Sequence, residues 1–382
     1  MSEFKNRIIT ISGEPASGKS TVLEALRKKY EEKGFKVHIF KVGHEFRRIA
    51  KEKGMTIEEL NEYMTKRGSI DKLIDSTVTK RGEEINSKER PDDVYIFDSR
   101  LAFHNIPNSF SIRLTVDDNV AGKRVFGDNK RGKEDTYDTL EDAIEKTYNR
   151  KLREVERYKK RYGIDLQDPE NYKLVIDTSY SKVEDITQLI EQCLELQIER
   201  GKLEEELLRL REGRVNVNNK LERILQIQQR IEETRYGKMW TSPKKLLPLQ
   251  RELDTLGMGF GSSLTLDEFI EKLKKEGYNP DSEIQSISVD NRLYIIEGHH
   301  RNFGAAKLGK ALVPYSIIAK DDEEISGYGK NTARQRAMSL NKYNMWGHEQ
   351  FFDEPGKQFS YNDIYPGIYD EITKREQEDI WR

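Results

Sequence analysis

Cysteine is nearly absent from this chain of 382 residues, which contains only Cys193. A single thiol forms no internal disulfide and no cysteine metal cluster, and such usage is typical of a reducing compartment. Long apolar runs are also missing, and none approaches the ~20 residues that a membrane-spanning helix requires. The first residues contain no long apolar stretch like that of a secretory signal. We therefore expect a cytoplasmic protein without a membrane partner.

An excess of charge of one sign is missing as well. The 66 Lys and Arg residues nearly balance the 68 Asp and Glu residues, and the formal net charge is −2. The chain as a whole therefore has no positive field that would attract nucleic acid. The Lys- and Arg-rich region 123–161 leaves open a local contact with DNA, so DNA stays open as a substrate.

The length predicts two or three domains, each with its own core. Residues 1–182 alternate β-branched apolar runs with amphipathic helical patterns, which predicts an α/β domain with a parallel sheet. Its expected strands are 7–12, 36–40, 93–98, 111–116 and 173–178.

Residues 183–238 have the pattern of a helical connector. Apolar side chains recur three and four residues apart from Ile186 to Ile231, with charges between them, and this heptad seam is typical of coiled coils. Gly201 and the stretch 212–219 weaken a single-rod interpretation, so two or three helices fit as well. Two interpretations stay open: a connector packed on its own neighbours, including as a hairpin, and an intermolecular coiled coil that makes a homodimer.

Residues 239–330 predict a small α+β domain. The expected elements are a helix at 265–276, strands at 284–289 and 292–297, a helix at 301–308 and a strand at 313–318. The extension 331–382 is rich in aromatic residues among charges, and its pattern indicates no particular fold.

The residues from Gly13 to Ser20 read G-x-x-x-x-G-K-S, between the first expected strand and a helix. That context is the one a P-loop requires, because small residues let successive N–H groups turn inward to hold phosphate oxygens. Lys19 is expected to reach the β- and γ-phosphates of ATP, and the Ser20 hydroxyl to bind Mg²⁺. The expected ATP-binding residues are Gly13, Ala16, Ser17, Gly18, Lys19, Ser20 and Thr21.

Several ordered segments resemble the short, archaeal-like type of cytidylate kinase. Besides the P-loop they are 42–63, 70–75, 98–107 and 157–179, and the similarity covers about residues 1–195. The resemblance implies a P-loop kinase that moves the γ-phosphate of ATP to a nucleotide-type acceptor, with CMP or dCMP as the implied substrate.

The same resemblance implies a set of phosphate-binding arginines. A lid at about 124–135 would close over ATP and supply Arg124 and Arg131 as catalytic cations. Guanidinium groups suit phosphate because they bind its oxygens two at a time, although each arginine also fits a solvated helix face. The implied substrate-binding residues are Arg47, Arg48, Arg100, Arg150 and Arg153.

Asp98, at the end of an expected strand, has two interpretations. A kinase that acts on an alcohol benefits from a carboxylate that accepts the hydroxyl proton, whereas a phosphate acceptor is already anionic. In the resembling family an acidic residue near this place serves Mg²⁺ or the lysine. Asp98 therefore fits a general base or a metal and structural role, and does not decide the acceptor.

A second candidate site is the sequence EGHHR, in which a strand and a glycine turn precede a helix. The helix N-terminus would face an anion, with Arg301 and two imidazoles as contacts; zinc is a weak competitor because adjacent histidines point apart. The stretch resembles the ParB/sulfiredoxin-like superfamily, near the free serine kinase type, over about 264–320. The resemblance implies phosphate binding by Gly298, His299, His300 and Arg301, with Glu297 as a carboxylate beside them. A purely structural role for the histidines stays open.

The leading hypothesis is an ATP- and Mg²⁺-dependent phosphotransferase with a second phosphate-binding domain. One alternative is a kinase for an alcohol: a hydroxymethyl-pyrimidine in modified viral DNA, or a small metabolite such as serine or inositol. The other is a nucleotide-gated interaction module without acceptor turnover.

Overall fold

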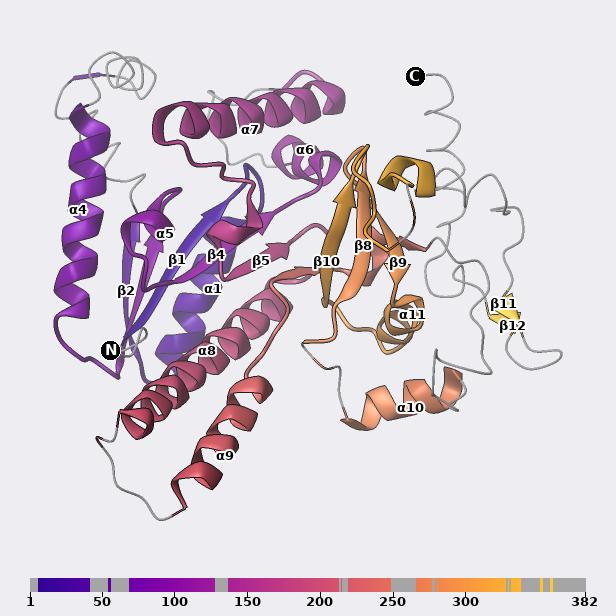
Figure 1. Ribbon diagram of the computed structural model, residues 1–382. Coiled ribbons are helices and arrows are strands. Elements are labelled where there is room, and N and C mark those ends of the chain that lie inside the picture. The colour runs from indigo at the N-terminus through magenta and orange to yellow at the C-terminus, as the bar shows by residue number, and fades with distance from the viewer. Residues whose placement is uncertain are drawn as a thin grey trace. The chain divides into compact units, whose positions relative to one another are not determined.

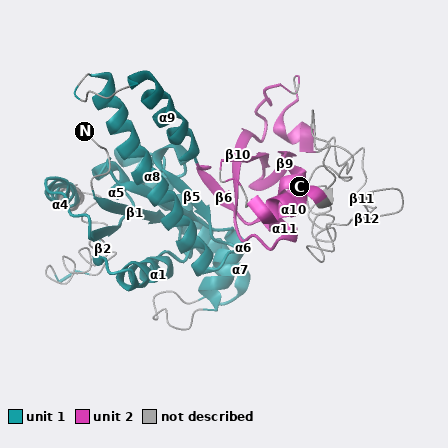
Figure 2. Ribbon diagram, turned by 90° about the horizontal axis from the view of Figure 1, so that it is seen from below, with its two compact units in different colours: residues 1–235 teal, residues 236–382 magenta. Residues whose placement is uncertain are grey.

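The computed structural model describes residues 6–41, 54–55, 69–127, 137–212, 214, 219–248, 266–276, 279, 281–327, 329 and 331–337, with two short strands at 351–352 and 358–359. The chain divides into two compact units, Met1–Arg235 and Tyr236–Arg382 (Figure 2). The expected connector 183–238 is therefore, up to Arg235, part of the first unit and not a separate segment.

The first unit is built on a parallel sheet with strand order β2-β3-β1-β4-β5 (Figure 1). The strands are β1 (Arg7–Gly13), β2 (Lys36–Lys41), β3 (Asp93–Asp98), β4 (Phe110–Thr115) and β5 (Leu174–Asp177). The predicted α/β architecture is confirmed. Because β1 lies between β3 and β4, the order of connections changes direction beside it, and ligands of open α/β sheets bind at the carboxyl ends of strands at such a point.

Helices cover both faces of this sheet (Figure 1). Helix α1 (Lys19–Glu32) packs beside α8 (Val183–Arg211) on one face. Helices α4 (Ser69–Asn86) and α5 (Ala102–Asn105), which connect β2 to β3 and β3 to β4, lie on the other face. There α4 and α5 form a core with β1 and β3, made by Ile8, Val78, Ile85, Tyr95, Phe97, Ala102 and Ile106.

Helices α6 (Asp118–Phe126) and α7 (Leu140–Tyr162) connect β4 to β5 and pack against each other. Their ends follow local sequence signals. The Asp117 side chain accepts hydrogen bonds from the first turn of α6, and Thr139 caps α7 by accepting from the Asp142 N–H group. Gly163, with φ of 68°, ends α7 in the left-handed conformation that glycine adopts most easily.

Helix α8 and α9 (Lys220–Glu233) form an antiparallel hairpin. Ion pairs Arg223–Glu206 and Arg230–Glu199, each at 2.7 Å, fix the opposite directions of the two helices. Gly201 does not divide α8 but is buried within it. Of the two interpretations of the seam, the structure shows packing within the chain. The side chains between the helices are Leu203, Leu207, Leu210, Ile224, Ile227 and Ile231.

The second unit contains a mixed sheet in the order β6-β10-β8-β9-β7, with β10/β8 and β9/β7 parallel. Its elements are β6 (Met239–Thr241), β7 (Leu246–Pro248), α10 (Leu266–Glu276), β8 (Ile284–Val289), β9 (Arg292–Glu297), α11 (His299–Lys307) and β10 (Val313–Lys320). Helix α11 covers one face through Ala305, and α10 packs on α11 at Gly304. The expected helices and longer strands of this unit are present, whereas the short β6 and β7 were not expected.

Two further facts bear on the expectations. Within the described ranges no helix is long and apolar enough to cross a bilayer. Most of the extension 331–382 lies outside the described residues, apart from 331–337 and the short strands β11 (Phe351–Phe352) and β12 (Gln358–Phe359), which pair antiparallel.

Candidate functional site

The loop between β1 and α1 is shaped by close contacts of its small residues. A Cβ atom on Gly13 would lie 2.7 Å from Ser17 Oγ and 3.3 Å from Leu114 Cβ, so the loop passes where only glycine fits. Ala16 and Gly18 have φ values of 62° and 77°, which turn the backbone back toward the start of α1. The loop therefore wraps in front of the helix N-terminus.

The N-terminus of α1 is open toward this loop. Gly18 is the N-cap residue, and no side chain among the described residues caps the helix. The Thr21 and Val22 N–H groups donate to the Gly18 carbonyl, each at 3.0 Å. The remaining first-turn N–H groups and the helix dipole form a ready anion site. The expected ATP-binding residues lie in this loop and at the start of α1, where the Ser20 side chain is exposed at the surface, and their role stays a prediction.

Lys19 forms an ion pair with Asp98, which ends β3 beside β1. Both side chains are largely buried, with exposed fractions of 20% and 15%. Burial and then the nearby Arg100 guanidinium lower the pKa of Lys19 below its ordinary value, while the Asp98 carboxylate opposes this. Lys19, Asp98 and Arg100 therefore lie close together at the carboxyl ends of the central strands.

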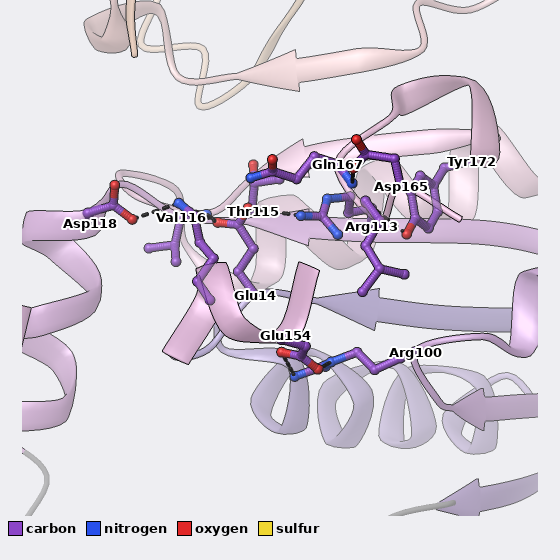
Figure 3. A network of polar contacts seen from close by, with 12 residues as sticks. Glu14, Arg100, Arg113, Thr115, Val116, Asp118, Glu154, Asp165, Gln167 and Tyr172 are labelled. Atoms are coloured by element: carbon purple, nitrogen blue, oxygen red, sulfur yellow. Dashed lines mark hydrogen bonds and ion pairs between the residues drawn. The ribbon is translucent and has the colours of Figure 1, made fainter. Parts of the chain in front are cut away.

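Arg100 is bound by a carboxylate from α7. Its Nε and Nη2 atoms donate to the two carboxylate oxygens of Glu154, the second at 3.2 Å (Figure 3). Although burial opposes it, Arg100 holds the pKa of Glu154 below its usual range. Arg100, expected to bind the acceptor phosphate, is thus paired within the protein, and this pairing with Glu154 was not expected from the sequence.

The other arginines expected at the site lie in different environments. Arg150 and Arg153 are exposed on α7, and Arg153 donates to the Asn149 carbonyl of its own helix. Arg124 donates to the carbonyl oxygens of Ala16 at 3.1 Å and Thr178 at 2.6 Å, so it joins the β1–α1 loop to the residues after β5. Arg47, Arg48 and Arg131 lie outside the described residues.

A further group that sequence reasoning missed surrounds Glu14, inside the loop itself. Its carboxylate forms an ion pair with Arg113 at 2.9 Å and accepts from the Val116 N–H group at 3.2 Å (Figure 3). A second cation, Lys151, lies 3.7 Å from the same carboxylate. The sequence offered one signal for this group, because Glu14 is an acidic residue within a loop that is expected to bind phosphate.

Among the described residues no group of three or more His, Cys, Asp or Glu side chains could hold a metal. The Ser20 hydroxyl stays the predicted Mg²⁺ ligand, since proteins hold Mg²⁺ at nucleotide sites through one or two ligands completed by phosphates and water.

The EGHHR segment of the second unit forms the start of α11. Gly298 is the N-cap with φ of 97°, and a Cβ there would lie 3.1 Å from Arg301 Nη2. Arg301 donates to Ser282 Oγ and to the Glu283 carbonyl, both at 2.8 Å. His299 is 6% exposed, and burial, then the neighbouring His300, lowers its pKa to about 3. His299 is therefore neutral in the folded protein, while Glu297 is exposed.

The chain is similar to known kinases over its first half. Residues 8–180 match the cytidylate kinase-like family. A cytidylate kinase from Methanocella arvoryzae is 35% identical over 48% of this chain and 94% of its own length, and one from Methanosarcina barkeri is 35% identical over 44% and 86%. An S-adenosylmethionine-dependent nucleotide dehydratase from Lacinutrix mariniflava is 36% identical over 48% of this chain, but over only 34% of its own length.

The parallel sheet, the loop at the N-terminus of α1 and these relatives define the first unit as a nucleotide kinase-like phosphotransferase. The matched residues 8–180 all lie within this unit. The chain belongs to the cytidylate kinase-like family.

Proposed function

We propose that the protein is a P-loop kinase that moves the γ-phosphate of ATP, with Mg²⁺, to a nucleoside monophosphate, with CMP or dCMP as the first choice. The observation that carries this proposal is the placement of two cations, Lys19 and Arg100, beside the uncapped N-terminus of α1. A transferring phosphoryl group spreads negative charge over its oxygens, and preorganised cations stabilise that charge.

In this proposal the residues of the first unit have separate roles in binding and transfer. Backbone N–H groups of Ala16 and of residues 18–20 hold the phosphates, Lys19 contacts the transferring group, and Ser20 binds Mg²⁺. ATP with its metal supplies the phosphoryl group and neutralises charge between the β- and γ-phosphates. The contact of Asp98 with Lys19 supports a role in orienting that lysine and in binding metal through water, rather than a role as general base.

Arg100 is the proposed anchor for the acceptor phosphate. Its guanidinium already holds a planar, two-oxygen anion in the form of the Glu154 carboxylate. A phosphate presents the same pair of acceptor oxygens, so it can replace Glu154 without moving Arg100 far. The names of the two cytidylate kinase relatives support a cytidine nucleotide as the acceptor.

The test is ADP release from the full chain with parallel acceptors: CMP, dCMP, free serine, inositol and hydroxymethylated DNA. We expect turnover with CMP or dCMP and its loss in Lys19→Ala. The matched control is Lys28→Ala, because Lys28 is an exposed residue of the same helix and forms a loose ion pair with Glu32 at 3.8 Å. Turnover only with an alcohol would show that the acceptor is an alcohol and not a nucleoside monophosphate. ATP binding without any acceptor-dependent turnover would refute the kinase proposal.

We further propose that the second unit binds a nucleotide phosphate at the N-terminus of α11, in the manner of ParB/sulfiredoxin-like domains. Support comes from the position of Gly298 as the N-cap of α11 and from Arg301 folded over Gly298. Because His299 is neutral and buried, Arg301 is the proposed cation of the site and His300 its neighbour. Calorimetry with ADP and ATP in the Lys19→Ala background should show residual binding that Arg301→Ala removes and Lys310→Ala keeps. Unchanged binding in Arg301→Ala would refute this second site.

A further inference from the structure

Glu14 places a carboxylate inside the loop that we propose binds phosphate. A free carboxylate at that distance from a triphosphate would weaken binding through like-charge repulsion. The loop needs backbone N–H groups and small residues, and nothing in that requirement calls for an acid. We therefore expect neighbouring cations to neutralise the charge of Glu14, and the carboxylate to have a structural role in the loop.

The carboxylate is buried and turned toward β4. The side chain of Glu14 is 8% exposed and that of Arg113, its partner at 2.9 Å, is 5% exposed. The second carboxylate oxygen accepts the Val116 N–H group at 3.2 Å, and the Glu14 N–H group donates to the Leu114 carbonyl at 2.9 Å. Backbone and side chain of Glu14 together fasten the loop to the end of β4.

A third contact connects the loop to α7. Lys151 lies 3.7 Å from the Glu14 carboxylate and 2.7 Å from Asp118, the first residue of α6. Lys151 is 16% exposed, so solvent screens these contacts only in part. The same helix carries Glu154, the partner of Arg100. Helix α7 thus holds the phosphate loop through Lys151 and the proposed acceptor arginine through Glu154.

We propose that Glu14 is a positioning residue, which holds the phosphate loop in its binding conformation and, through Lys151, makes that conformation depend on the placement of α7. The inference rests on the proposed function. The Glu14 carboxylate is buried between two cations, Arg113 and Lys151, which neutralise its charge. These contacts hold the loop to β4 and α7. The anchor fixes the N–H groups of residues 16–20 before ATP arrives, so less ordering is left to the binding step.

The first test compares Glu14→Gln with wild type in steady-state kinetics of the full chain. The amide keeps the shape but removes the counter-charge of Arg113 and leaves Lys151 with the Asp118 carboxylate. We therefore expect the KM for ATP to rise about tenfold, as for the loss of one charged hydrogen bond, while the KM for the acceptor changes little. Lys151→Met should raise the KM for ATP about threefold. Lys146→Met is the matched control, because Lys146 lies on the same helix and pairs with Asp142 in an exposed ion pair.

The second test separates positioning from folding. Glu14→Leu alone leaves the buried Arg113 cation unpaired and should lower the melting temperature. The double variant Glu14→Leu/Arg113→Met removes both charges and should regain much of that stability while the KM for ATP stays raised. A double variant with wild-type KM for ATP, or a Glu14→Gln enzyme with unchanged KM, would overturn the inference. Absence of turnover in wild type would instead refute the proposed function, and the same comparison would then be made with the Kd for ATP.

Discussion

Helix α6 crosses α7 at Gly122, and this position has no room for a side chain. A Cβ atom on Gly122 would lie 2.3 Å from Ile144 Cγ1, 2.8 Å from Ile144 Cα and 3.0 Å from its nitrogen. Carbon atoms in contact normally stay ~3.5–4.0 Å apart. The Ile144 side chain can rotate away, but its backbone atoms cannot, so Gly122→Ala must push α7 away from α6.

The expected cost follows from two opposing contributions. Alanine in place of glycine in a helix contributes about 1 kcal/mol of stability, whereas overpacking at a tight contact costs about 1–3 kcal/mol. Because two of the three contacts involve backbone, we take the upper end and expect a net loss of about 2 kcal/mol in the free energy of unfolding. The displaced α7 also carries Lys151 and Glu154, so ATP-dependent turnover should fall together with stability.

The assay is urea unfolding followed by circular dichroism, with turnover measured on the same preparations. Gly127→Ala is the matched control at the end of the same helix. Its nearest atom is the Lys123 carbonyl oxygen at 3.3 Å, and its φ of −82° suits alanine. We expect Gly127→Ala to stay within about 0.5 kcal/mol of wild type. Equal stability of the two variants would show that α6 and α7 can move apart without a cost in free energy, and would refute the packing argument.

Three further outcomes are expected. Burial raises the pKa of the Cys193 thiol to about 12, so a disulfide reagent at neutral pH should label it only when the chain unfolds; rapid labelling of the native protein would contradict this. Since burial keeps His299 neutral, its folded pKa lies below the unfolded value of about 6.5, and its contribution to stability, complete above that value, should be lost toward acid by up to about 1.4 kcal/mol per pH unit. His299→Gln should lack that slope in thermal scans of the second unit. Glu154 has a depressed pKa, so its pairing with Arg100 stabilises the protein above about pH 4.3 and weakens below it. Wild type should therefore lose more stability than Glu154→Gln between pH 6 and 3, and parallel losses would contradict the assignment.

Local pattern was sufficient for the elements of the first unit. The strands around β1 are short runs rich in β-branched residues between amphipathic segments. This apolar pattern indicates buried strands even when the neighbouring strands are unknown. The loop between β1 and α1 was equally readable, because Gly13 and Gly18 shape the backbone of one continuous segment, and its binding of phosphate stays a prediction. The same local reasoning overestimated the effect of Gly201, since a helix tolerates glycine where close packing compensates for its propensity.

The amino-acid sequence by itself determined the strands of the first sheet, the helices and longer strands of the second unit, and the family that the first unit resembles. Tertiary structure alone decided which charges meet. Arg100 pairs with Glu154 across 54 residues, and Glu14 with Arg113 across 99, in contacts made by the return of distant segments to one edge of the sheet. Periodicity and spacing describe neighbours along the chain, whereas an ion pair depends on distance in space and on the exclusion of water. For that reason the sequence gives no partner for the acidic Glu14, whereas the tertiary structure shows its carboxylate paired with Arg113 at the end of β4.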